Sequence, residues 1–229
     1  MEETGLSADY GEIAAACARL APLFERADGI EVTFSTGCCL SAGHTCHFDI
    51  SDHKPAFQDN GRLHPGARKD APQLTNLPAG EVCTCPNEAE DNRTAGEIPV
   101  AVGDETIIFE VKNNQIVDVK GDSPIAEEKR REFRDEVALR NIAEVAIGCN
   151  DKAVVTGNVL EDEKAGFHWA YGRSDLFGGK IGVEAFSSPD KVCHIDIVYA
   201  RGNPIVCTRF DFVFPDGTRK TAIIDGVLC

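Results

Sequence analysis

The stretch Val192-Cys193-His194-Ile195-Asp196-Ile197-Val198-Tyr199-Ala200 decides how we expect the chain to fold. Its Ile and Val content is typical of a strand, in which His194 and Asp196 lie on one face while the apolar residues between them point the other way. Nearby, Phe167-His168-Trp169-Ala170-Tyr171-Gly172 carries a further histidine between apolar residues and a glycine. Two ligand side chains on one strand face, beside a second histidine, are a common basis for a divalent metal site.

The charge balance narrows the classes of partner. The formal net charge is −15, from 23 basic and 38 acidic side chains, so we expect neither nucleic acid nor a membrane surface as a partner. No apolar run approaches the ~20 residues of a spanning helix, and Met1-Glu2-Glu3-Thr4-Gly5 does not resemble a signal peptide. These features favour a cytoplasmic protein, in which ten cysteines without a C-x-x-C pair are expected to be reduced.

The remaining patterns indicate an α+β fold with mostly antiparallel strands and two principal helices. Apolar residues at spacings of three and four predict a helix over residues 9–28, which Pro22 would kink or split. About nine strands are expected, including 30–34, 98–102, 106–112, 115–120 and a C-terminal hairpin. We expect one metal-binding domain over residues 1–229.

Residues 35–76 are expected to form an irregular, loop-rich segment, because turn signals recur in it. It holds four of the six histidines. His44-Thr45-Cys46-His47 could be a fragment of a metal site, although its ligands do not form the two spaced pairs that a closed zinc site prefers.

Ser123-Pro124 is a typical helix start, and we expect one long helix from there to Gly148. Glu144 would then lie in an apolar patch near the end of the helix, where the helix dipole and burial both disfavour a carboxylate. A bound cation would offset both effects. A side chain that simply points to solvent would explain Glu144 equally well.

Four motifs, in this order, resemble the metallopeptidases aminopeptidase T and aminopeptidase S. They are Asn76-Leu77-Pro78-Ala79-Gly80-Glu81-Val82, Ala143-Glu144-Val145-Ala146-Ile147-Gly148-Cys149-Asn150, the segment from Leu160 through Glu163 and His168 to Gly172, and His194-Ile195-Asp196. The resemblance covers residue 73 to the end well and the first 70 residues loosely. It implies the fold of that family's metal-binding domain, while the family's additional N-terminal domain has no counterpart in this sequence.

The resemblance implies two divalent cations, of zinc, cobalt or manganese. By motif position, Glu81 and Asp196 would hold one cation, His168 and His194 would hold the other, and Glu144 would bridge them. Two cations at such a site make a water molecule more acidic and polarise a peptide carbonyl.

The resemblance also implies catalytic residues. Glu163, five residues before His168, matches the family's catalytic glutamate and would act as the general base. The family has a tyrosine seven residues after the His168 position, where this sequence has Asp175. Tyr171, four positions away, is then the candidate for stabilising the tetrahedral intermediate.

Three functions remain open. The first is a metal-dependent hydrolase that removes N-terminal residues from peptides, which both Glu81 and Glu144 favour. The second is an Fe(II)-dependent ring-cleaving dioxygenase, because the sequence also resembles the 2,5-dihydroxypyridine dioxygenases. That resemblance implies one Fe(II) ion held by two histidines and an aspartate, which His168, His194 and Asp196 would supply. The third is a non-catalytic binding protein. We expect an enzyme with a peptide or small-molecule substrate, and the resemblance implies a homodimer.

Overall fold

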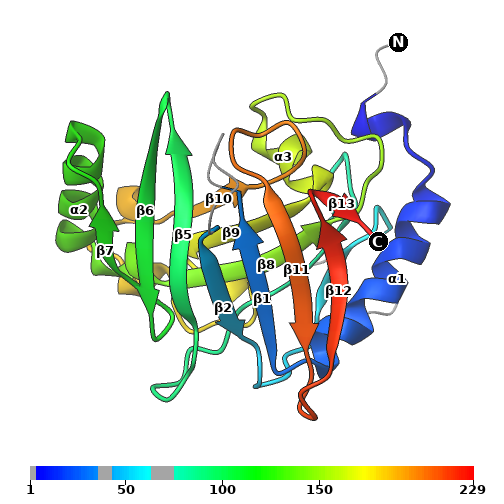
Figure 1. Cartoon of the computed structure of the whole chain (residues 1–229), viewed down its shortest axis with the longest axis horizontal. Helices are drawn as coiled ribbons and strands as arrows, with labels where there is room; N and C mark the ends of the chain where they lie inside the picture. The colour runs from blue at the N-terminus through cyan, green and yellow to red at the C-terminus, as the bar shows by residue number, and fades with distance from the viewer. Residues whose placement is uncertain (1–3, 36–42, 63–74) are drawn as a thin grey trace.

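The protein forms two antiparallel β-sheets with helices at their sides (Figure 1). The structure is a computed structural model that describes residues 4–35, 43–62 and 75–229. Within these ranges it contains three α-helices and thirteen strands. The expected α+β class and the predominance of antiparallel pairing are confirmed.

Eight strands form the larger sheet. They are β1 (Gly29–Phe34), β2 (Thr45–Asp49), β5 (Ala95–Val102), β6 (Glu105–Lys112), β7 (Gln115–Lys120), β11 (Cys207–Val213), β12 (Arg219–Ile224) and β13 (Val227–Leu228). Their order in space is β13-β12-β11-β1-β2-β5-β6-β7. Asn113 and Asn114, with φ of 50° and 59°, form the expected tight turn between β6 and β7.

Five strands form the smaller sheet. They are β3 (Phe57–Asp59), β4 (Glu81–Thr84), β8 (Ile142–Gly148), β9 (Phe167–Gly172) and β10 (His194–Val198). Their order in space is β10-β9-β8-β4-β3. Figure 1 shows β8, β9 and β10 crossing behind the larger sheet.

Aromatic side chains from both sheets fill the space between them. Phe34 on β1 packs against Phe167 on β9, with ring centroids 6.0 Å apart, and Phe109 on β6 meets Trp169 on β9 at 6.3 Å. All four side chains are buried. Because side chains alternate along a strand, the other face of β9 is directed away from this core.

The helices cover the two sides of the sheets. They are α1 (Tyr10–Arg26), α2 (Pro124–Asp135) and the short α3 (Val159–Asp162). Asp9 caps α1 by accepting from two backbone N–H groups, and Ser123 caps α2. Of the expected kink or split at Pro22, the split does not occur, because α1 continues through Pro22, which lies on its exposed side. Among the described helices, none has the length and apolar content needed to cross a bilayer.

The chain from residue 123 to 148 corrects the expectation of one long helix. Helix α2 ends at Asp135, a 3-10 helix covers Val137–Arg140, and Glu144 lies in strand β8. Every residue of β8 is buried, so both of its faces are covered. A strand buried on both faces gives a continuous apolar run that periodicity does not separate from a buried helix.

Residues 35–76 are more regular than expected, because β2 and β3 lie within them. His44 Nδ1 lies 2.7 Å from Glu97 Oε2, and none of the groups of possible metal ligands among the described residues includes His44 or His47. Cys38, Cys39 and His64 lie outside the described residues.

The aromatic core between the sheets should contribute strongly to the free energy of unfolding. Phe109 contacts Phe133, Trp169 and Tyr171 edge-on, so Phe109→Ala leaves a cavity and should lower the free energy of unfolding by about 3–5 kcal/mol. Urea denaturation measures this. The control Val117→Ala removes a half-exposed side chain and should change stability by less than about 0.5 kcal/mol. Equal effects of the two substitutions would contradict this description of the core.

Candidate metal centre

The smaller sheet places its polar side chains on the face turned away from the aromatic core. Asp196 on β10 and Glu144 on β8 are both register partners of Ala170 on β9. Directly paired residues share a face, and His168, two residues before Ala170, lies on that face as well. The alternation of three neighbouring strands therefore brings these three side chains together.

The same rule positions the other two expected ligands. His194 lies two residues before Asp196 on β10. Glu81 on β4 pairs with Gly148, which is four residues after Glu144 on β8. The structure thus brings together all five side chains that the sequence analysis named as metal ligands.

Distances within this group are short. His194 Nε2 lies 2.9 Å from Glu144 Oε2 and 3.4 Å from Asp196 Oδ1. His168 Nε2 lies 3.3 Å from Glu81 Oε2 and 3.8 Å from Glu144 Oε1. Glu144 is therefore the central member, between the two histidines.

Both imidazoles are oriented by backbone carbonyls. His194 Nδ1 lies 2.7 Å from Arg173 O, and His168 Nδ1 lies 3.3 Å from Gly166 O. An Nδ1–H that donates to a carbonyl leaves Nε2 as the ligand atom, which is the usual arrangement of a metal-binding histidine. Both Nε2 atoms point toward the carboxylates.

His168 Nε2 supports a metal at this site. The side chain is 1% exposed, and its buried Nε2 lies 3.3 Å from Glu81 Oε2 without an aligned hydrogen bond. Buried polar atoms nearly always have a well-aligned partner, and a bound ion would supply one here. Imidazole nitrogens and carboxylate oxygens are also the donors that Zn²⁺, Mn²⁺ or Fe²⁺ accept. The residues present therefore fit a divalent cation.

Three sets of side chains place ligand atoms within 4.8 Å of one another in the part of the chain that the structure describes. They are Glu81 with Glu144 and His168, Glu144 with His194 and Asp196, and Glu163 with His168 and Asp196. This grouping differs from the expectation that Glu81 and Asp196 share one cation. The reason is topological: β8 and β9 separate β4 from β10.

The acidic surroundings change the proton affinity of the histidines. Burial lowers the pKa of His168, but the Glu81 and Glu144 carboxylates outweigh burial and raise it to about 9. For His194, burial is likewise outweighed by Asp196 and Glu144, and the pKa rises to about 11. Burial raises the pKa of Glu81, yet His168 and the Lys164 charge together lower it to about 2. Protons on the histidines therefore compensate part of the buried negative charge.

Sequence reasoning missed two members of the cluster, Lys164 and Asp59. The Lys164 side chain is fully buried, with Nζ 2.8 Å from Glu81 Oε1, 2.5 Å from Glu163 Oε1 and 3.5 Å from Asp59 Oδ2. Asp59 is the register partner of Glu81 on β3. A lysine next to a glutamate in sequence is typical of an exposed pair; the one available signal was the apolar segment that follows it.

Gly148 allows the segment that carries Glu163 and Lys164 to approach the end of β8. A Cβ at residue 148 would lie 2.3 Å from Glu163 O and 2.4 Å from the Lys164 carbonyl carbon. Gly148 N donates to Gly166 O at 2.8 Å, and Asn150 N donates to Lys164 O at 3.1 Å. Close backbone packing thus fixes Glu163, whose pKa burial and the Glu81 charge raise, beside the ligands.

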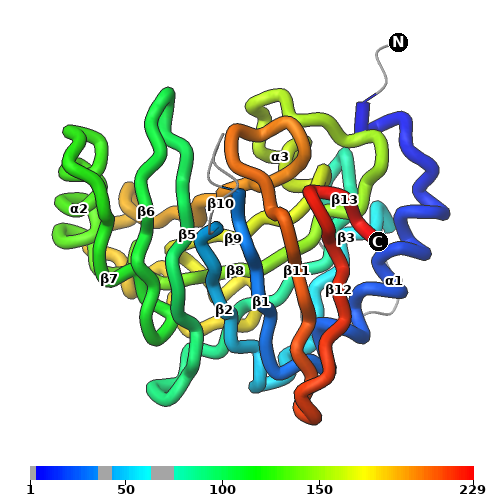
Figure 2. Tube along the Cα trace, viewed as in Figure 1, coloured from blue at the N-terminus to red at the C-terminus, as the bar shows by residue number. Residues whose placement is uncertain are grey.

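The N-terminal segment also lies against this region, beside residues 149–162 (Figure 2). Gly5 N donates to the buried carboxylate of Glu161 at 2.7 Å. Asn150 Nδ2 donates to Gly5 O at 3.0 Å and to Ala79 O at 2.8 Å. These contacts hold the loop after β8 in place next to Glu163.

Tyr171 does not contact this cluster, which corrects the role expected of it. Its ring packs against Phe109, Phe133 and Trp169 in the core between the sheets. It is an odd number of residues from His168 on β9, so the two side chains lie on opposite faces. Asp175, at the position of the family's tyrosine, forms a partly exposed ion pair with Arg173.

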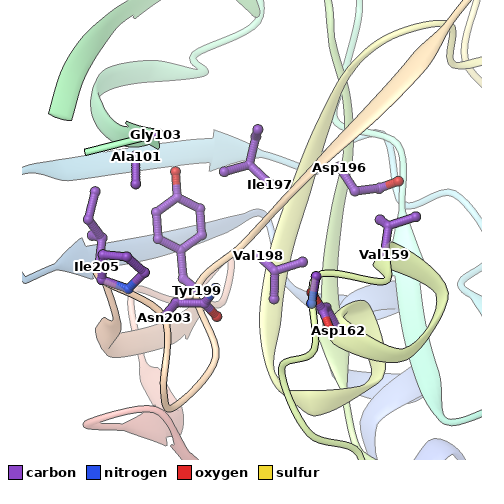
Figure 3. A pocket seen from close by; sticks show the side chains of 12 residues that line it. Ala101, Gly103, Val159, Asp162, Asp196, Ile197, Val198, Tyr199, Asn203 and Ile205 are labelled. Atoms are coloured by element: carbon purple, nitrogen blue, oxygen red, sulfur yellow. The ribbon is translucent and has the colours of Figure 1, made fainter. Parts of the chain in front are cut away.

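A cavity of about 360 Å³ adjoins the cluster at Asp196. Figure 3 shows Asp196 and Val159 on one side of it and Tyr199 and Ile205 on the other. Its walls are mainly apolar, and Asp162 is a second carboxylate among them. The volume is in the range of cavities that bind small molecules.

No family model matches the sequence, and no curated protein matches it. Solved structures match the fold. Aminopeptidase T (AmpT) from Thermus thermophilus has a TM-score of 0.58 and 21% identity, over 96% of this chain and 52% of that chain. A 2,5-dihydroxypyridine dioxygenase from Pseudomonas putida has a TM-score of 0.63 and 19% identity, over 95% of this chain and 59% of that chain.

The expected resemblance to an aminopeptidase T and to a 2,5-dihydroxypyridine dioxygenase is confirmed at the level of the fold. The chain spans between half and three fifths of the length of these two proteins. This chain carries histidines and carboxylates that could hold a metal.

The raised pKa values predict how metal affinity depends on pH. The histidines hold protons at neutral pH and must lose them to bind a cation, so affinity should rise with pH by up to about tenfold per pH unit for each proton released. The contribution of His168 levels off above about pH 9 and that of His194 above about pH 11. Calorimetric titration with Zn²⁺ measures it. Glu144→Gln, the control, should weaken binding at every pH, and a pH-independent wild-type affinity would contradict the prediction.

Proposed function

We propose that the chain is a metal-dependent hydrolase that acts on the amide bond of a peptide or a peptide-like molecule. The observation that carries the proposal is the convergence of Glu144, His168, His194 and Asp196 with the buried carboxyl group of Glu163. A ligand set and an independent proton acceptor in one place are what metal-assisted hydrolysis requires.

A divalent cation bound there would polarise the scissile carbonyl and make a water molecule more acidic. Glu163 would accept the proton from that water and pass it to the leaving amine. Burial and the Glu81 charge raise the pKa of Glu163, which makes its carboxylate a better proton acceptor. Lys164, 2.5 Å from Glu163 Oε1, would hold the carboxylate in position without donating to the substrate.

The cavity favours a substrate with a free amino terminus. Asp196 and Asp162 line it. Asp162 already accepts hydrogen bonds from the N–H groups of Thr156 and Gly157, but negative charge at this end of the cavity attracts an α-ammonium group and repels an α-carboxylate. The apolar walls from Val159, Val198 and Ile205 would accept the first side chain. Removal of N-terminal residues is therefore the form of hydrolysis that we propose, and the name of AmpT gives the same activity for the protein with a similar fold.

A second candidate is an Fe(II)-dependent ring-cleaving dioxygenase. His168, His194 and Asp196 would supply two imidazoles and one carboxylate, the set typical of non-haem iron oxygenases. The specific observation that favours it is the Lys164–Glu81 pair, which engages one carboxylate of a two-metal site. The fold of a dioxygenase is also similar. A homodimer and a cytoplasmic location remain predictions.

Hydrolysis of amino-acyl anilides by the metal-loaded protein tests the first proposal. Glu163→Gln should lower kcat by about a hundredfold or more, because it removes the proton acceptor, while metal content stays unchanged. Glu184→Gln, at an exposed acidic residue, is the matched control and should retain activity. Oxygen consumption on a dihydroxylated aromatic compound, without anilide hydrolysis, would favour the dioxygenase. Inactivity on both substrates would contradict both enzymatic proposals and favour a non-catalytic binding protein.

The cavity can be tested separately. Val159 is 44% exposed and lines the cavity, so Val159→Trp should fill part of it with little effect on folding. We expect KM for the anilide to rise by about tenfold while metal content stays the same. Val117→Trp, the same change at an exposed strand position outside the cavity, should leave KM unchanged. An unchanged KM in Val159→Trp would place substrate binding elsewhere.

A further inference from the structure

We infer that the centre holds one divalent cation, and that the Lys164 ammonium supplies the positive charge that a second cation would supply at Glu81. The inference rests on the proposed metal-dependent function and goes beyond it in the number of ions and in the role of Lys164. It departs from the two cations that the sequence predicts.

Lys164 is enclosed by carboxylates rather than by solvent. Its side chain has no exposed surface, and Nζ lies within 3.5 Å of oxygens from Asp59, Glu81 and Glu163. A buried ammonium is stable only when anions surround it. These three carboxylates are therefore already compensated, in part, by a charge that belongs to the chain.

This arrangement disfavours a cation in the set of Glu81, Glu144 and His168. Glu81 has Oε1 on Lys164 and only Oε2 directed at His168. A cation at Oε2 would lie a few ångströms from a buried ammonium, and like charges at that distance repel strongly where water does not screen them. Lys164 cannot withdraw to solvent, because it is buried on all sides.

The other ligands lie away from Lys164. Glu144, His194 and Asp196 form one set, whereas each set that includes His168 also includes Glu81 or Glu163. The described ion pairs of Lys164 involve Glu81 and Glu163 but none of Glu144, His194 and Asp196. One cation in this set would have the His194 imidazole and the carboxylates of Glu144 and Asp196 as ligands and would adjoin the cavity at Asp196.

Lys164 is then a positioning residue. It holds Glu81, whose Oε2 lies 3.3 Å from His168 Nε2, and it holds Glu163 as the proton acceptor beside the cation. Glu81 would then pair with Lys164 and His168 rather than bind the metal.

Metal counting tests the inference directly. The chain is stripped with a chelator, loaded with excess Mn²⁺ and desalted, and bound metal is measured by mass spectrometry and by electron paramagnetic resonance. We expect one Mn²⁺ per chain, with the spectrum of an isolated ion. Two ions with an exchange-coupled spectrum would overturn the inference and leave the proposed function intact. No bound Mn²⁺ would overturn both.

Variants separate the roles of the carboxylates. Glu81→Gln should keep one ion per chain, whereas His194→Ala should lose it. Lys164→Met frees Glu81 and should allow a second ion, while Lys220→Gln, at an exposed lysine, should keep one. Loss of the ion in Glu81→Gln would overturn the inference by making Glu81 a ligand. Because Glu81→Gln and the wild type suffice for this decision, the test does not depend on the folding of Lys164→Met.

Discussion

Buried negative charge is the constraint on which the functional half of the structure depends. Glu81 and Glu144 on the smaller sheet and Glu163 in the 3-10 helix beside it are each less than 10% exposed. Burying a charged side chain costs several kcal/mol unless a group of opposite charge lies beside it. Lys164, protonated histidines and a bound cation are three ways to provide that charge, and the arrangement of β3, β4, β8, β9 and β10 places all three within reach.

The aromatic core and the polar cluster are opposite faces of the same strands. On β9, Phe167 and Trp169 pack between the sheets while His168 faces the carboxylates. The rigidity of the packed face fixes the geometry of the polar face, as a site built on strands requires. This also explains why a peptidase and a dioxygenase can share a similar fold, because the chemistry depends on a few side chains and on the ion that they bind.

Much of this was predictable from the sequence, and the failures have physical causes. The alternation around His194 and Asp196 identified a strand face, and the resemblance added Glu81, Glu144 and His168, all of which meet in space. Glu144 was assigned to a helix, because a strand covered on both faces lacks the period of two. Lys164 and Asp59 could not be found, because their contact joins β3 to a segment more than a hundred residues later. Which carboxylate shares an ion with which histidine depends on strand order, which the sequence does not contain.

Gly148 lets the segment that carries Glu163 and Lys164 lie beside the strands that carry the metal ligands. Its bare Cα lets residues 163–166 lie against the end of β8, while the ligand strands are held by their own ladder and by the aromatic core. A side chain at position 148 would clash with the backbone of Glu163 and Lys164 and would move this segment away from Glu144, His194 and Asp196. A single methyl group could therefore displace the proton acceptor while these three ligands stay in place. A chain could lose the proton acceptor in this way and persist as a metal-binding protein with the same fold.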